Sequence, residues 1–60
     1  AARSILAAAR DGHWWVQTTA LKALARRRPP GTANAARLAS NSDNDAVRAA
    51  GRRLAAAVGI

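Results

Sequence analysis

The chain has 60 residues and a formal net charge of +7, carried by nine arginines and one lysine against three acidic residues. Half of the residues are hydrophobic, but 18 of these 30 are alanine, so only twelve large apolar side chains can build a core. This length allows one small domain at most, and its own core supplies little stability. The sequence has no cysteine, which excludes disulfides and thiolate metal sites. No apolar run reaches the ~20 residues that span a bilayer.

The first half of the chain predicts two helices. The first covers residues 1–10, because Ile5, Leu6 and Ala9 are spaced to share one face. Asp11 and Gly12 end it, and Asp11 is placed to cap the next helix. The second covers residues 13–27 and presents a wide apolar surface, suited to contacts with two neighbours. Its two apolar stripes are Val16, Ala20, Ala23 and Leu24, and Trp14, Thr18, Leu21 and Ala25. The segment 29–31 (Pro-Pro-Gly) ends this helix and reverses the chain.

The second half of the chain predicts two more helices, over residues 33–40 and 44–58. Thr32 is the expected N-cap of the third helix, and Leu38 is its only large apolar residue. Residues 41–44 (Asn-Ser-Asp-Asn) form a turn, because all four side chains can bond to the local backbone. The apolar face of the fourth helix consists of Val47, Ala50, Gly51, Leu54 and Val58, and Gly59 suits its C-terminal end. The fold class predicted is all-α: four short helices as two antiparallel helical hairpins.

An internal repeat is indicated by Val16 and Val47, which lie 31 residues apart in segments of similar layout. A repeat of this length, made of helix, turn and helix, is typical of a solenoid. The pattern Asp-x-x-x-x-Val-x-x-x-Ala-Leu-x-x-Leu over residues 11–24, and Asp-x-Asp-x-x-Val-Arg-x-Ala over residues 43–50, resembles HEAT-like repeats. The resemblance implies a single domain of about two repeats, residues 1–30 and 31–60, whose second helices line a concave wall. Gln17 and Ala55 depart from it, since arginine and a large aliphatic residue are usual there, and Leu54 can serve in place of the latter.

The same resemblance implies several functions. Members act as protein-binding scaffolds, as nucleic-acid binders and, in one branch, as alkylpurine DNA glycosylases. The pair Trp14 and Trp15 is similar to the aromatic-rich second helices of that branch, but residues 16–18 supply no catalytic carboxylate. His13 has no second ligand at metal-site spacing. The acidic residues all sit where helix caps are expected: Asp11, Asp43 and Asp45. We therefore expect no enzymatic activity, no cofactor and no metal site.

The arginines are the main functional signal. Arg48 and Arg52 share a helix face with Arg53 beside them, and residues 26–28 end the equivalent helix one repeat earlier. Guanidinium groups bind phosphate in a bidentate manner. The predicted anion-binding residues are Arg26, Arg27, Arg28, Arg48, Arg52 and Arg53. Such binding is salt-sensitive and largely independent of sequence. A solvated basic face, or GC-rich coding that favours arginine, would give the same pattern.

The two tryptophans are the expected aromatic contacts. Trp14 and Trp15 point about 100° apart on a helix, so one is expected in the core and the other exposed. An exposed tryptophan can stack on a base, meet a protein or sit at a lipid interface.

The sequence thus predicts a non-catalytic, cytoplasmic binding module for an anionic macromolecule: DNA, RNA or an acidic protein. Further repeats or another chain are expected to stabilise it. The alternative is a secreted, cationic membrane-active peptide of the bacteriocin type, which the length, the charge and a circular chain would suit. Arginines on several helix faces and the polar segment 41–45 argue against it. A helix-turn-helix DNA binder fits less well, because no helix stands out as a reader of base edges. The start lacks both methionine and the layout of a secretory signal, and indicates a processed product or a piece of a longer protein.

Overall fold

A computed structural model describes residues 2–10 and 12–59 of the chain, and all of them lie in helices or in the turns between them. The helices are α1 (Ala2–Ala8), α2 (Trp14–Arg27), α3 (Thr32–Ser40) and α4 (Asp45–Val58). The all-α prediction is confirmed, and the predicted bounds of the last three helices agree with these to within one residue. The first helix is shorter than predicted, since Arg10 lies in a turn and Ala1 is outside the described residues.

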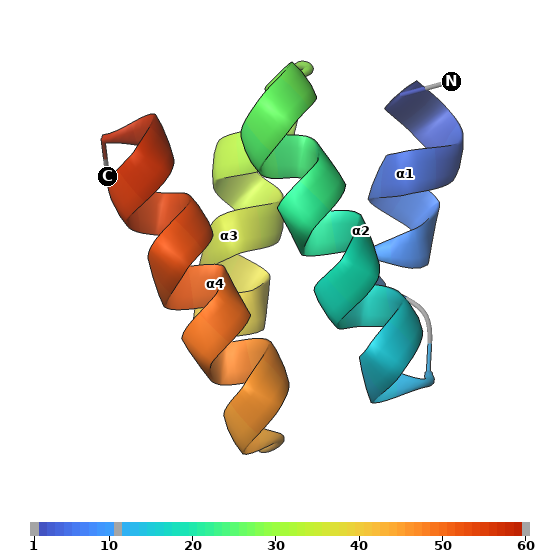
Figure 1. The fold of residues 1–60 in the computed structure, drawn as a ribbon, viewed down its shortest axis with the longest axis vertical. Helices are drawn as coiled ribbons and strands as arrows, with labels where there is room; N and C mark the ends of the chain where they lie inside the picture. Colours follow the sequence, from blue (N-terminus) through green and yellow to red (C-terminus); the bar gives the residue numbers. More distant parts are fainter. Residues whose placement is uncertain (1, 11, 60) are drawn as a thin grey trace.

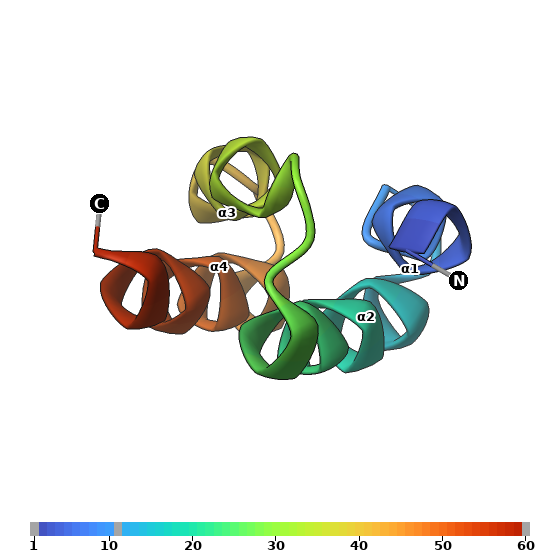
Figure 2. The ribbon, with the colours of Figure 1, turned by 90° about the horizontal axis from the view of Figure 1, so that it is seen from above.

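The four helices form two layers. Consecutive helices run in opposite directions (Figure 1). Seen from above, α1 and α3 form one layer while α2 and α4 form the other (Figure 2). The main packing contacts are α3 with α4, α2 with α4 and α1 with α2. Since α2 also touches α3, it contacts all three of the other helices.

The core lies among α2, α3 and α4. Leu21, Leu24, Val47 and Leu54 are its largest fully buried side chains, each at most 2% exposed. The other buried apolar residues are all alanines: Ala20, Ala35, Ala36 and Ala39. Because alanine removes little surface from water, four aliphatic side chains supply most of the hydrophobic stabilisation.

The two helices of the second layer match each other closely. Both have 14 residues, and they begin at Trp14 and Asp45, 31 residues apart. The residues that precede them, His13 and Asn44, both have extended backbones. At the C-terminal caps, Arg28 and Gly59 are both left-handed, with φ of 48° and 80°.

The helix caps differ from the predicted ones. Gly31, with φ of 94°, is the N-cap of α3. Thr32 is instead the first helical residue, and its buried Oγ1 donates to the Pro29 carbonyl at 2.6 Å. The cap of α4 is Asn44, because its extended backbone points Oδ1 at the free amides of Ala46 and Val47, at 2.9 and 3.1 Å.

Asp43 and Asp45 therefore do not cap α4 in the way the sequence indicated. Asp43 lies one residue too early to cap α4, and Asp45 lies inside its first turn. The predicted cap at Asp11 lies outside the described residues.

Candidate anion-binding groove between α2 and α4

The parallel helices α2 and α4 lie side by side because Leu21 and Leu54 are buried between them, at 1% and 2% exposure. The small residues Ala25 and Ala50 leave a groove of about 280 Å³ between the two helices. These four side chains form its apolar part.

Three cations line the same groove. Lys22 and Arg26 come from α2, one helical turn apart, and Arg53 comes from α4. All three side chains are exposed. Lys22 and Arg53 occupy corresponding positions of the two helices, 31 residues apart. The described residues that line the groove include no acid, so its charged side chains are all positive.

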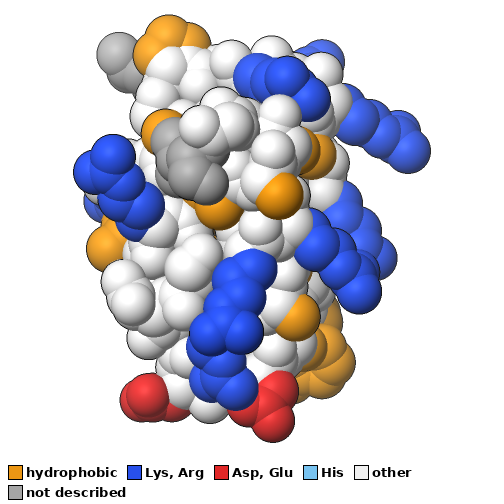
Figure 3. Space-filling view, turned by 90° about the vertical axis from the view of Figure 1, so that its left-hand side faces the viewer, with side chains coloured by type: hydrophobic (Ala, Val, Ile, Leu, Met, Phe, Trp, Pro, Cys, Tyr) orange, Lys and Arg blue, Asp and Glu red, His pale blue; other side chains and the backbone are white. Residues whose placement is uncertain are grey.

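The basic surface continues over α2. A second hollow, of about 420 Å³, is lined by Lys22 and Arg26 again, together with Arg27, Thr19 and Ala23. Figure 3 views the molecule from the side that carries α4. Lys and Arg side chains lie along much of this view, and the acidic side chains lie at its lower end.

Of the predicted anion-binding residues, Arg26 lines both hollows, Arg53 lines the α2–α4 groove and Arg27 lines the hollow over α2. The other three line neither hollow: Arg28, Arg48 and Arg52. The Nε of Arg28 donates to the Ala25 carbonyl at 3.2 Å, which holds this side chain at the end of its own helix. Arg52 is exposed on α4, at the position that corresponds to Leu21 in α2.

Arg48 makes its polar contacts with other residues of the chain. Its guanidinium is half-buried, donates through Nη1 to the Ser42 carbonyl at 3.0 Å and pairs through Nη2 with the carboxylate of Asp45. This arrangement ties the first turn of α4 to the α3–α4 turn.

Lys22 is not among the residues that the sequence predicts for anion binding, which are all arginines. A signal for it existed, because a shift of 31 residues places Lys22 on Arg53.

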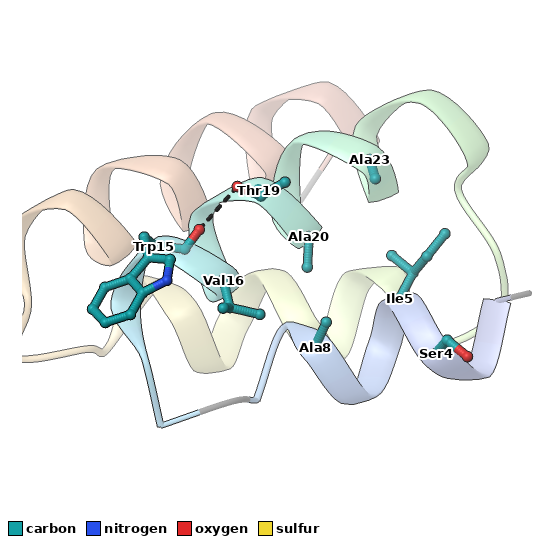
Figure 4. A pocket seen from close by; sticks show the side chains of 8 residues that line it. All are labelled: Ser4, Ile5, Ala8, Trp15, Val16, Thr19, Ala20 and Ala23. Atoms are coloured by element: carbon teal, nitrogen blue, oxygen red, sulfur yellow. Dashed lines mark hydrogen bonds between the residues drawn. The ribbon is translucent and has the colours of Figure 1, made fainter.

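Neither tryptophan belongs to the core, which corrects the expectation that one of them would. Trp14 and Trp15 are 49% and 54% exposed. Their ring centroids are 5.9 Å apart in an edge-on arrangement, and the Trp15 ring lies 4.9 Å from that of His13. For Trp15 the short α1, which ends at Ala8, gives the reason: Figure 4 shows this ring beyond the end of α1, where that helix does not cover it.

Comparisons with known proteins give no family assignment. Neither the protein-family models, nor the curated proteins, nor the solved structures include a match to this chain. The function is therefore argued from the groove itself.

In the described part of the chain, no three His, Cys, Asp or Glu side chains gather as metal ligands do. Asp43 and Asp45 are exposed at the beginning of α4. None of the described helices has both the length and the apolar character required to cross a bilayer.

Proposed function

We propose that the chain is a non-catalytic binding module of about two HEAT-like helical repeats, which binds an anionic macromolecule along the α2–α4 groove. The repeats are residues 1–30 and 31–60, each an antiparallel helical hairpin. The equal lengths, the 31-residue spacing and the matching ends of α2 and α4 support this repeat.

The single observation that carries the proposed activity is the convergence of Lys22, Arg26 and Arg53 on one groove. Three cations from two helices face a partner together as one row of charge. Arginines scattered around a single helix would point in different directions and could not all contact the same partner. Arg26 and Arg53 offer planar, bidentate donors to phosphate or carboxylate oxygens, and Lys22 adds a compact charge between two hollows. Arg27 extends the row.

The binding we propose is salt-dependent and carries little sequence preference. Neutralising three phosphates of duplex DNA gives a slope of about −2.7 in a plot of log K against log salt concentration. Fluorescence anisotropy with a labelled DNA duplex, a single-stranded RNA and an acidic peptide, each from about 20 to 200 mM salt, measures this slope.

The decisive comparison uses two triple variants of equal charge. Lys22→Gln, Arg26→Gln and Arg53→Gln together should weaken binding and lower the slope by about 2–3. Arg10→Gln, Arg37→Gln and Arg52→Gln change exposed cations that do not line the groove, and they should lower the slope by less than about 1. Equal losses in the two variants would mean that net charge, not the groove, is responsible. Failure of all three probes to bind at the lowest salt would refute the proposed activity.

A further inference from the structure

A third hollow, whose lining carries no charge, shares Thr19 and Ala23 with the basic hollow over α2. It has a volume of about 410 Å³ and lies between α1 and α2. Figure 4 looks into it, with α3 and α4 behind. The residues that line it are Ser4, Ile5, Ala8, Trp15, Val16, Thr19, Ala20 and Ala23. Not one of these residues is charged, although the chain carries 13 charged residues among 60.

The lining residues correspond to core positions in the other half of the chain. A shift of 31 residues places Val16 on Val47 and Ala23 on Leu54, which are 1% and 2% exposed. In the first half, by contrast, Val16 and Ala23 are only partly buried. The same shift places Ser4, Ile5, Ala8 and Ala20 on Ala35, Ala36, Ala39 and Gly51, all of which are buried.

The corresponding residues are more buried in the second half because another helix, α2, packs against α4. There α2 covers α4: Ala50 and Leu54 of α4 meet Leu21 and Ala25 of α2. Thr19 and Ala23 are the residues of the first half that correspond to Ala50 and Leu54. The α1–α2 edge is thus the counterpart of a surface that, elsewhere in the same molecule, is covered by a parallel helix.

The structure also indicates the chemistry of the helix that fits. The face of α2 that covers α4 presents Leu21, Leu24 and Ala25, at i, i+3 and i+4. The corresponding residues on the free side of α4 are Arg52, Ala55 and Ala56. A second copy stacked in the same sense would place Arg52 against Thr19 and Ala23, which line a hollow together with Lys22 and two arginines, so that like charges would repel each other.

We propose that the α1–α2 edge is a docking surface for an amphipathic helix of a partner protein, lying parallel to α2 and presenting uncharged Leu and Ala at i, i+3 and i+4. Trp15, half-exposed at one end of the hollow, supplies a large aromatic contact of the kind that dominates protein interfaces. This proposal rests on the repeat arrangement of the proposed function but not on anion binding.

The test supplies such a helix from the protein itself. Residues 1–31 are duplicated in front of the full chain, so that the new junction, Gly31 followed by Ala1, corresponds to the natural junction of Gly31 and Thr32. The added α2 then presents Leu21, Leu24 and Ala25 to the original α1–α2 edge. We expect one cooperative thermal transition with a midpoint at least about 5 °C above that of the 60-residue chain.

Two variants test whether the rise in the thermal midpoint comes from this surface. Leu21→Arg, made in the added copy alone, introduces the residue that α4 has at the corresponding position, Arg52, and should remove the rise. Thr19→Glu in the original half should also remove the rise. In the 60-residue chain the same substitution should not lower the midpoint, because Thr19 is exposed there and the formal charge falls from +7 to +6.

Three outcomes would overturn the docking proposal: separate transitions for the added and original parts, an equal gain with Leu21→Arg, or dimerisation of the 60-residue chain that Thr19→Glu abolishes. The last would identify a second copy as the occupant. The anion-binding titrations use other residues and the unextended chain, so either proposal can fail while the other stands.

Discussion

Gly51 determines how closely α3 and α4 approach each other. A Cβ atom at this position would lie 2.5 Å from the Ser40 nitrogen, and 2.6 and 2.7 Å from the Cβ and carbonyl carbon of Ala39. All these distances are shorter than real Cβ contacts, and two of the three atoms belong to the backbone, which cannot turn aside. The sequence placed Gly51 on the apolar face of its helix, but alanine would have suited that pattern equally well. Its role depends on the helix spacing, which the pattern does not encode.

We therefore predict that Gly51→Ala destabilises the protein by about 1–3 kcal/mol, because the added methyl group forces the two helices apart. Helix propensity alone predicts the opposite sign, a gain of about 1 kcal/mol. Urea unfolding followed by circular dichroism measures the difference. Gly12→Ala is the control: no atom lies within 4 Å of the added Cβ, so its effect should be close to zero. A stabilised Gly51→Ala variant would mean that α3 and α4 are not in this close contact.

Arg48 and Arg52 are alike in sequence but differ in structure. Arg48→Gln should cost about 1 kcal/mol, because it removes a charged donor from the Ser42 carbonyl and the partner of Asp45. The cost is modest because the Asp45 side chain is 91% exposed, and exposed ion pairs contribute little. Arg52→Gln, one turn later and exposed, should change stability by less than about 0.5 kcal/mol. Equal unfolding midpoints for the two variants in urea would contradict the structural role given to Arg48.

At the scale of helices, the ends of α2 and α4 show the same backbone built from different residues. Gly59 adopts the left-handed conformation without strain, whereas Arg28 holds it with a full side chain. The matching ends of α2 and α4 therefore predict a substitution that the local sequence would not suggest.

Arg28→Gly should stabilise the protein by about 0.5–1 kcal/mol, because it relieves the left-handed strain, whose cost is roughly 1–2 kcal/mol. The lost bond from Nε to the Ala25 carbonyl is exposed and offsets only part of the gain. Arg27→Gly removes the same charge at the last residue of α2 and should destabilise by up to about 1 kcal/mol. Thermal unfolding of the two variants should thus give shifts of opposite sign. A shared direction would show that charge, not backbone conformation, governs this end of the helix.

The sequence specified the helices better than their contacts. Helix α2 was predicted to within one residue because residues 29–31 allow no continuation. The N-cap of α3 was misplaced, since Thr32 is a good cap by residue type but Gly31 has the required backbone. The exposure of Trp15 followed from the length of α1, which alanine-rich sequence defines poorly. In the groove, Arg26 and Arg53 were predicted, whereas the separation of Arg48 depended on a turn contact that spacing alone does not show.

At the scale of the whole molecule, charge and size act together. The net charge of +7 is confined to a body of 24 × 23 × 14 Å, with a radius of gyration of 9.6 Å. At about 10 mM ionic strength the Debye length is about 30 Å, so every cation repels every other across the molecule. At about 150 mM it falls to about 8 Å, less than the thickness of the protein. Unfolding separates these charges and relieves the repulsion, which favours the unfolded chain most strongly at low salt.

Added sodium chloride should therefore raise the thermal midpoint between about 10 and 150 mM, with most of the gain complete once the Debye length is shorter than the molecule. Arg37→Glu tests the cause. Arg37 is exposed on α3 and outside the groove, and the substitution lowers the formal charge from +7 to +5. This variant should be more stable than the parent at low salt, and the two midpoints should converge as salt is added. A midpoint that falls with salt, or an equal rise in both proteins, would show that the basic surface is already compensated within the fold. In that case the α2–α4 groove would have little unscreened charge left with which to attract an anionic partner.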